Sequence, residues 1–123
     1  MQRLILAAAL SLASGSASAF DIACDRPEYL QLKSADKAEL QQEFCRTTRA
    51  HLLNIDLHRE TQSTISKLRS IGADTSKQTA QAEQDLAAAL SCSKAAAEYA
   101  GALERRFKSK PPAVKICTSP GGI

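Results

Sequence analysis

Hydrophobic and small residues recur along most of the chain at steps of three and four positions. This spacing forms a seam on one side of a helix that packs lengthwise against another helix. Small residues dominate the seam in the later part, which lets two helix axes approach toward the lower end of about 8–10 Å. That seam comprises Thr79, Ala82, Leu86, Ala89, Ser93, Ala96, Ala100, Leu103 and Phe107.

The earlier part of the chain has a broader apolar face, typical of a helix that is contacted from two sides. Its members are Leu40, Phe44, Leu52, Leu53, Ile55, Leu57, Ile65 and Leu68. The two patterns together predict two long helices that run antiparallel as a hairpin. No useful period-2 alternation occurs, and aromatic residues make up only 4% of the chain.

Helix starts are indicated by two capping boxes, in which an acidic residue is followed three positions later by glutamate. Asp25 with Glu28 predicts a short first helix, and Asp36 with Glu39 predicts the start of a long second one. Pro27 is compatible with the first turn of the short helix.

The ends of the long helices are marked as clearly. Gly72 can adopt the left-handed conformation that closes a helix, and Asp74 or Ser76 can cap the next one. Pro111 and Pro112 prevent its continuation. We therefore expect an all-α fold, a disulfide-stapled antiparallel hairpin with a short N-terminal helix and an extended C-terminal tail. The predicted elements are helices over about 26–33, 36–71 and 75–108 and a tail over 109–123.

The first residues have the features of a secretory signal peptide. Arg3 precedes an apolar run over 4–13, and Ala17 and Ala19 form an A-x-A cleavage site. The run is shorter than the roughly 20 residues that span a bilayer, so we expect no stable membrane insertion. The sequence thus predicts a signal peptide over 1–19, a single helical domain over 20–123, and a periplasmic or secreted product.

All four cysteines, Cys24, Cys45, Cys92 and Cys117, follow the predicted signal peptide. An even number in a short exported chain indicates two disulfides, and four cysteines allow three pairings. Cys92 is therefore interpreted as half of a crosslink, although it lies within an alanine-rich helix. Staples of this kind are expected in a small chain that has no tryptophan and few aromatic residues.

The geometry of a helical hairpin restricts which cysteines can form a disulfide. Cys45 and Cys92 lie at distances from the turn that differ by eight residues, about 12 Å of helix rise, so a straight hairpin does not join them. Cys24 meets Cys45 if the first helix folds back on the second, and Cys92 meets Cys117 if the tail runs back along its own helix. We expect these two bridges. The nested pairing, Cys24 with Cys117 and Cys45 with Cys92, is the alternative and requires a kink or a shifted register.

Residues that could perform chemistry are few. His51 and His58 are seven positions apart, about 10 Å along a helix, whereas helical metal ligands are spaced by three or four. They are interpreted as surface or seam histidines. The sequence contains no glycine-rich phosphate loop and no C-x-x-C motif. We therefore predict a protein that is not an enzyme, with no catalytic residue, no metal site and no cofactor.

Five cations without an acid follow Glu104 and are the candidate partner-binding residues. Cations near a helix C-terminus also complement the helix dipole, which is the alternative role. The full chain carries a net charge of +3, one unit less without Arg3, which is too small to indicate a nucleic-acid partner. A protein partner in the cell envelope is expected instead, and if the five cations bind it, they dock an anionic surface. The five residues are Arg105, Arg106, Lys108, Lys110 and Lys115.

Two short segments carry a resemblance to a known family. Glu43-Phe44-Cys45, followed by Leu52-Leu53-Asn54-Ile55-Asp56, resembles the lysozyme-inhibitor LprI-type N-terminal domain, in which a cysteine precedes a leucine-rich helix. Phe20-Asp21-Ile22-Ala23-Cys24 is similar to the Phe-Asp-Cys start of that domain. The resemblance covers residues 20–60 and implies an exported, cysteine-stapled helical protein. The later tryptophan of the family has no counterpart here, and no site residues are carried over.

These features predict a non-enzymatic binding protein of the cell envelope, such as an inhibitor or an immunity-type factor. A rigid, stapled helical face meets the needs of such a protein. The alternative is a structural or assembly component that uses the alanine-rich seam to form oligomers.

Overall fold

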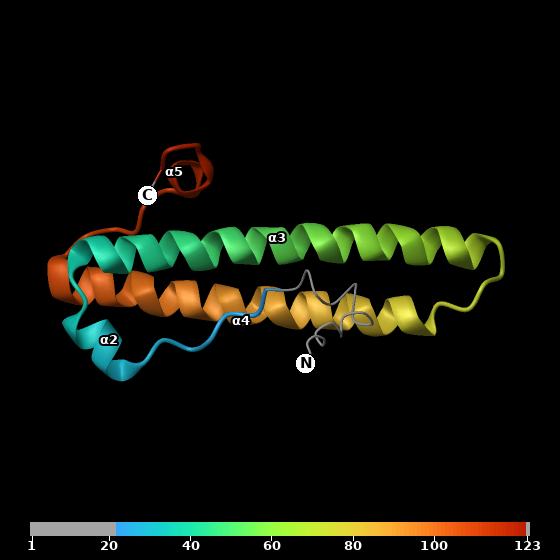
Figure 1. Cartoon of the computed structure of the whole chain (residues 1–123), viewed down its shortest axis with the longest axis horizontal. Helices are drawn as coiled ribbons and strands as arrows, with labels where there is room; N and C mark the ends of the chain where they lie inside the picture. The colour runs from blue at the N-terminus through green and yellow to red at the C-terminus, as the bar shows by residue number, and fades with distance from the viewer. Residues whose placement is uncertain (1–21, 123) are drawn as a thin grey trace, which may run out of the picture.

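Two long antiparallel helices, side by side over most of their length, form the body of the molecule (Figure 1). The computed structural model describes residues 22–122, so the predicted signal peptide lies outside the described residues. Within them the elements are α2 (Tyr29–Ser34), α3 (Lys37–Ser70), α4 (Ser76–Phe107) and α5 (Val114–Thr118), and no strand is found. The predicted all-α, disulfide-stapled hairpin is confirmed. No helix in this part of the chain is both long and apolar enough to cross a bilayer.

Local sequence explains the ends of α3. The side chain of Asp36 accepts a hydrogen bond from the backbone N–H of Glu39 at 2.8 Å, and Glu39 Oε1 accepts one from the N–H of Asp36 at 3.4 Å. At the other end Gly72 has φ +74°, and the N–H of Ala73 bonds to the carbonyl of Leu68. These bonds are the capping box and the glycine-terminated end that the sequence predicts.

The ends of α4 are built differently. Asp74 Oδ1 accepts hydrogen bonds from both the backbone N–H and the hydroxyl of Ser76. These bonds hold the pKa of the Asp74 carboxyl below its usual value. The helix ends at Phe107 because Lys108 adopts φ 51°, a left-handed conformation that glycine usually provides.

The predicted capping box at the first helix is wrong. Residues 22–28 are extended, α2 begins at Tyr29, and no side chain caps it. We call residues 22–28 the N-terminal arm. It runs along α4 toward α2 (Figure 1), and Pro27 is buried within it. Long-range contacts of the arm, described below, outweigh the weak local preference for a helix turn.

The buried seam of α4 differs from the predicted one at every second position. Ala82, Ala89, Ala96 and Leu103 are buried as predicted, but Leu86 is 41% exposed. The alternate seam positions each lie one residue earlier, and they are Asp85, Cys92 and Tyr99. The hydrophobic pattern did not identify these buried positions because one is an aspartate and another is a cysteine.

The facing seam of α3 is polar at its centre. Asn54 and Thr47 are fully buried, whereas Leu52 and Leu53 are 36% and 42% exposed. His51 and His58 are half-buried and face α4. The prediction of a broad leucine face was therefore only partly correct. Leu40 and Ile65 are buried toward the two ends of α3, and the buried residues between them are small or polar.

The apolar core lies at the end of the hairpin that carries α2, which we call the proximal end. The end at Gly72 is the distal end. The core cluster contains Cys24, Ala35, Leu40, Ala50, Cys92, Ala95, Tyr99, Ala102 and Leu103. Leu32 of α2 and Phe44 of α3 pack against it.

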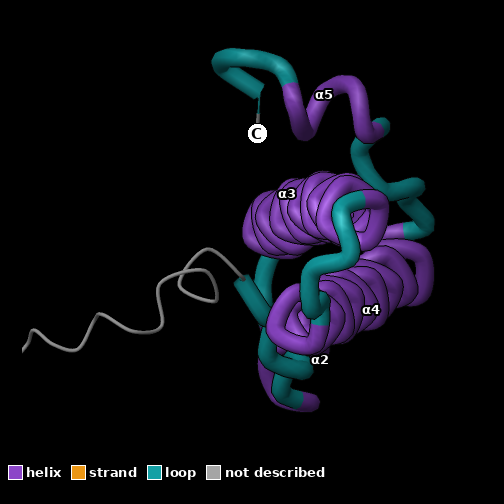
Figure 2. Tube along the Cα trace, turned by 90° about the vertical axis from the view of Figure 1, so that its right-hand side faces the viewer, coloured by secondary structure: helices purple, strands orange, loops and turns teal. Residues whose placement is uncertain are grey.

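The C-terminal segment crosses to α3 after α4 ends. Residues 108–113 lead into the five-residue helix α5, which the sequence did not predict within the tail. Figure 2 shows α2 and α5 on opposite sides of the hairpin. Arg49 of α3 donates a hydrogen bond to the carbonyl of Cys117 at 3.0 Å, which holds α5 against α3.

Candidate functional site

Two disulfides fasten the terminal segments to the hairpin. Cys24 of the arm is bonded to Cys92 of α4, with Cα atoms 4.7 Å apart. Cys45 of α3 is bonded to Cys117 of α5, with Cα atoms 4.9 Å apart. All four cysteines are crosslinked, as predicted, and none is free. Both expected pairings are wrong, however, since the bridges follow the third one.

The pairing differs from both expected ones because neither terminal segment folds back in the expected direction. The arm does not return along α3 but lies against α4, which places Cys24 at Cys92. The tail does not return along α4 but crosses over α3, which places Cys117 at Cys45. Cys45 and Cys92 do not pair with each other, as the eight-residue difference in their distance from the turn predicts. Each is bonded instead to a cysteine of a terminal segment.

Polar side chains position the arm at its disulfide. Asn54 Oδ1 accepts a hydrogen bond from the N–H of Ile22 at 3.2 Å, and Asn54 Nδ2 donates to the Ile22 carbonyl at 2.8 Å. The Ser91 hydroxyl accepts from the N–H of Cys24 at 3.1 Å and donates to the carbonyl of Ala88. Buried backbone groups need such partners, so α3 and α4 both contribute to holding the arm.

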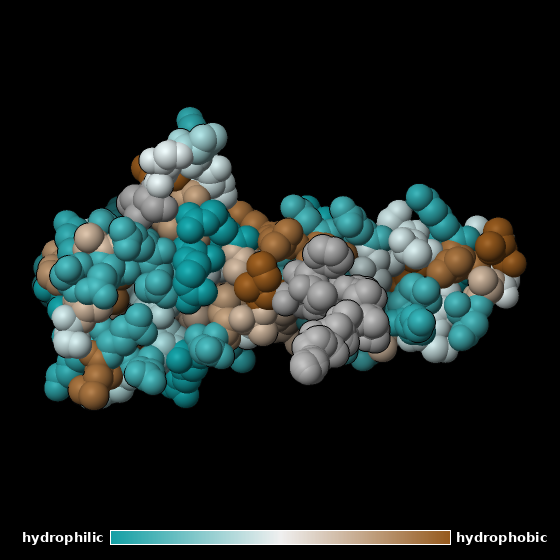
Figure 3. Space-filling view, in the orientation of Figure 1, coloured by the Kyte–Doolittle hydropathy of each residue, from teal (hydrophilic) through white to brown (hydrophobic). Residues whose placement is uncertain are grey.

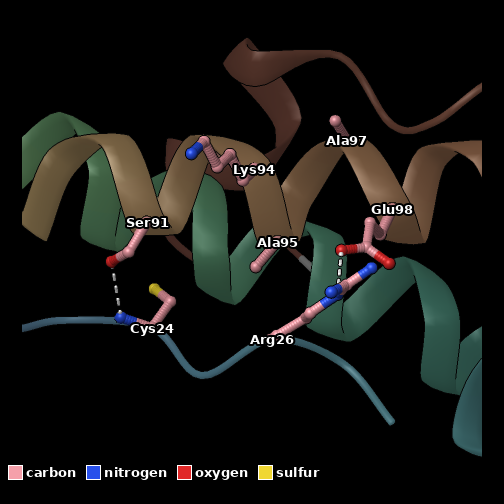
Figure 4. A pocket seen from close by; sticks show the side chains of 7 residues that line it. All are labelled: Cys24, Arg26, Ser91, Lys94, Ala95, Ala97 and Glu98. Carbon is pink, nitrogen blue, oxygen red and sulfur yellow. Dashed lines mark hydrogen bonds and ion pairs between the residues drawn. The ribbon is translucent and has the colours of Figure 1, made fainter. Parts of the chain in front are cut away.

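A first hollow opens between the arm and α4 and has a volume of about 520 Å³. Figure 4 shows Cys24 and Arg26 on the arm and Ser91, Ala95 and Glu98 of α4 pointing toward them, and Lys94 and Ala97 complete the lining. Arg26 Nε lies 3.3 Å from Glu98 Oε2, and its side chain is 86% exposed. An exposed pair of this kind contributes little to stability. The hollow is thus apolar on the alanine and cysteine side and charged at its rim.

A second hollow, of about 170 Å³, follows where α2 meets the end of α4. It is lined by Tyr29, Leu32, Lys33, Arg105 and Arg106. Arg106 Nη1 donates to the carbonyls of Leu32 and Ala35, at 3.0 and 2.6 Å. A cation at the C-terminal end of a helix compensates its unpaired carbonyls. Arg106 therefore ties α2 to α4 in addition to lining the hollow.

The five predicted cations do not form one patch. Arg105 and Arg106 lie at the second hollow, whereas Lys115 belongs to α5 on the opposite side of the hairpin (Figure 2). Lys108 ends α4, and Lys110 lies in the link to α5. The structure adds Lys33, which sequence reasoning missed. Its place four residues after Tyr29 was the signal available in the sequence. In the structure its Nζ lies 5.3 Å from the centroid of that ring.

The two histidines tie the long helices together. His51 Nδ1 lies 2.8 Å from the carbonyl oxygen of Ala89, and His58 Nδ1 lies 3.0 Å from that of Ala82. A carbonyl only accepts, so each Nδ1 carries the proton and donates. Alanine side chains leave these carbonyls accessible. The interpretation as seam histidines is confirmed, and the described residues include no group of three or more His, Cys, Asp or Glu that could hold a metal ion.

A buried carboxylate continues this polar seam toward the distal end. Asp85 is 1% exposed and accepts hydrogen bonds from Thr61 Oγ1 at 3.0 Å and from Gln81 Nε2 at 2.9 Å. A buried carboxyl group needs such hydrogen-bond partners to be tolerated. Asp85 and Thr61 connect α4 to α3 as the histidines do.

Ionisable groups also cluster at the proximal core. Burial of Tyr99, 3% exposed, raises the pKa of its phenol, and the charge of Glu43 adds to that effect. The Tyr99 hydroxyl donates to Gln31 Oε1 at 3.2 Å, which links α4 to α2. The hydrogen bond from Arg46 to Glu43 is the largest of the effects that raise the pKa of the Arg46 guanidinium.

Comparison with known proteins gives no relative: no family model, no curated protein and no solved structure matches this chain.

Proposed function

We propose that the protein is an exported, non-enzymatic binding protein, an inhibitor or immunity-type factor that acts on a protein of the cell envelope in the periplasm or outside the cell. The observation that carries this proposal is the covalent attachment of both terminal segments to the hairpin. Each attachment creates a surface shared by an arm and a helix. A surface fixed before binding loses little conformational entropy on association, which is what tight inhibitors require.

The compartment is supported by the same bonds. Disulfides persist in secreted and periplasmic proteins and are rare where thiols are kept reduced. The predicted signal peptide over 1–19 points to the same destination.

Two segments that resemble the LprI-type domain are in contact. Asn54, from the leucine-rich segment, pairs with both backbone groups of Ile22, from the segment that precedes Cys24. The residues of the resemblance therefore build one structural unit, the anchored arm. The resemblance itself is the support for an inhibitor of an envelope enzyme among the kinds of binding protein, and this contact joins its two segments in the fold.

The alternative, an assembly component, depends on an alanine-rich seam that is free to pack against another chain. Within the described residues that seam is buried inside the hairpin, where Ala82, Ala89, Ala95 and Ala102 have exposures of 3% or less. Oligomer formation would have to use other residues, such as the exposed Leu52, Leu53 and Leu90. Light scattering over a range of concentrations distinguishes the two functions, because a binding protein of this kind remains a monomer.

The test of the proposal is the reconstitution of a complex. The oxidised protein, recovered from an exporting host, is used to capture partners from envelope extract, and each candidate is then purified and titrated by calorimetry. We expect a one-to-one complex that weakens at least tenfold when Cys24→Ser and Cys92→Ser release the arm. Absence of any stoichiometric complex with a purified candidate, together with concentration-dependent self-association, contradicts the proposal and supports the assembly component.

A further inference from the structure

The two hollows follow one another along a single line, where the N-terminal arm and α2 lie against α4. Lys94 lines the first hollow and Arg105 the second. These residues are eleven positions apart on one helix, about 16 Å along its axis. An extended chain advances about 3.3 Å per residue, so five residues of a partner span this distance. We call this line the arm groove.

Positive charge concentrates at the second hollow of the arm groove. Lys33, Arg105 and Arg106 line the second hollow, and none of them forms an ion pair within residues 22–122. Glu28 and Glu104 adjoin these residues in sequence but do not pair with them in that part of the chain. Figure 3 shows that this end of the molecule has a mainly hydrophilic surface in the view drawn. Three unpaired cations at one small hollow favour a carboxylate-bearing ligand.

The guanidinium of Arg105 is positioned by a glycine inside α4. A Cβ atom built on Gly101 would lie 2.9 Å from Arg105 Nη1, so the guanidinium occupies the space that a side chain would fill. Glycine in the interior of a helix costs about 0.5–1 kcal/mol relative to alanine. In this arrangement the absence of a side chain at Gly101 leaves the space in which the Arg105 guanidinium lies.

The neighbouring cations are held as well. The two carbonyl bonds of Arg106 fix its guanidinium, and the carbon of that group lies 4.8 Å from the ring centroid of Phe107. Lys33 lies over the ring of Tyr29, whose side chain is 71% exposed. The second hollow thus presents oriented donors and an accessible aromatic ring.

The first hollow has a different chemistry. Cys24, Ala95 and Ala97 give it apolar walls, and Lys94 and the exposed Arg26 to Glu98 pair stand at its edge. A single phosphate group would need cations that converge on one point, whereas here an apolar hollow and a cationic one are separated by about 16 Å. An extended peptide with an apolar side chain and, about five residues away, a carboxylate satisfies both.

We propose that the arm groove binds an extended acidic peptide segment of the partner, with an apolar side chain in the first hollow and one or two carboxylates between Lys33, Arg105 and Arg106. This inference rests on the proposed function for the source of the peptide and names the chemistry that the partner must present.

The experiment measures direct binding to the full oxidised protein. The probes are Ac-Leu-Ser-Ser-Ser-Glu-Glu-amide and the same residues in reverse order, because either chain direction fits the line of hollows. The same peptides with glutamine in place of glutamate are controls. Binding is followed by amide chemical shifts at two salt concentrations. We expect one acidic peptide to bind, with shifts along residues 24–33 and 91–106, and to weaken as salt rises.

Variants place the peptide in the second hollow. Arg105→Gln and Lys33→Gln should each weaken binding about tenfold, the effect of one charge-assisted hydrogen bond. Lys67→Gln makes the same charge change on the exposed distal surface and should have no effect. Gly101→Ala is the sharpest variant: it should raise the thermal stability while it weakens binding severalfold, because the added methyl group displaces the Arg105 guanidinium.

Three outcomes overturn the inference: equal weakening by Lys67→Gln, no weakening by Arg105→Gln, or binding to phosphatidylglycerol vesicles but to neither peptide. Loss of peptide binding alone, while a purified envelope protein still binds, refutes the arm groove and leaves the proposed function intact. Peptide binding without any envelope partner refutes the proposed function and leaves the arm groove intact.

Discussion

The proximal and distal ends of the hairpin contain the same two helices but are held together in different ways. At the proximal end two disulfides, helix α2 and the cluster around Leu103 and Tyr99 fix the chain from several directions. At the distal end, within residues 22–122, α3 and α4 meet without a third element. There the buried side chains include Ile65, Ala82 and Asp85, and His58 and Thr61 donate hydrogen bonds across the seam.

The difference shows where binding surfaces can form in so slender a molecule. Two helices alone bury little apolar surface, and a small core supplies limited stability. Crosslinked arms compensate at the proximal end, and there they also create hollows between arm and helix. The distal end maintains helix pairing through polar contacts that set the register. We therefore expect rigidity and recognition at the proximal end and easier local opening at the distal end.

Removal of a bridge should have the largest effect. The cysteines of each pair are 68 and 72 residues apart, and the chain-entropy model assigns about 4 kcal/mol to the closure of loops of this size. The double variant Cys45→Ala with Cys117→Ala should therefore lose about that much free energy of unfolding in urea titrations. A loss below about 1 kcal/mol would show that the bridge does not account for proximal stability.

Truncation of core side chains compares the two ends directly. Leu103→Ala should cost about 4 kcal/mol, because Leu103 is fully buried within the proximal cluster. Ile65→Ala should cost about 2 kcal/mol, since the two-helix distal end can relax around the cavity. Both values come from chemical denaturation at neutral pH. Equal costs, or a larger cost at Ile65, would contradict the distinction between the ends.

The anchor of the arm should have an intermediate effect. Asn54→Ala leaves the N–H and the carbonyl of Ile22 without their partner and should cost about 2 kcal/mol. Gln62→Ala, on the exposed surface of the same helix, is the matched control and should change stability by less than about 0.5 kcal/mol. Faster proteolysis within residues 22–28 of the Asn54 variant should accompany the loss. Similar stability losses for both variants would show that Asn54 does not anchor the arm.

The smallest expected effect is a change in alkaline stability. The folded chain raises the pKa of the Tyr99 phenol, chiefly by burial, so the neutral form is favoured in the native state. Its contribution is fully present below the unfolded pKa of about 10 and is lost as pH rises through the folded pKa. Tyr99→Phe should therefore lose less stability than the natural protein as the pH rises above about 10. Identical pH profiles would show that Tyr99 ionises equally well in both states.

The sequence predicted those features of the hairpin correctly that depend only on residues adjacent in the chain. The capping box at Asp36 and Glu39 and the left-handed Gly72 depend on a few adjacent residues, and both are found in the structure. Ala82, Ala89 and Ala96 of α4 were predicted correctly from small residues at three- and four-residue steps, whereas the buried Ala88, Ala95 and Ala102 were not predicted. The fold class followed from these elements.

Features set by distant contacts could not be predicted in the same way. Asn54 and Ser91 hold the arm from positions 32 and 67 residues away, so no local pattern shows that residues 22–28 are extended. That error led to the wrong disulfide pairing. Asp85 was excluded from the seam by its charge, although Thr61 and Gln81 satisfy it when buried. Of the residues that line the second hollow, only Arg105 and Arg106 were predicted, because α2 brings Lys33 to Arg105 through tertiary packing.

The most direct test of the account is disulfide mapping of the natural oxidised protein. Trypsin cleavage at Lys37, Arg46, Lys77, Lys94 and Lys115 places each cysteine on a separate peptide. Mass spectrometry without reduction therefore distinguishes all three pairings. The account predicts linked peptides that join Cys24 to Cys92 and Cys45 to Cys117. Peptides that join Cys24 to Cys45, or any free thiol, would contradict the claim that both arms are clamped across the hairpin.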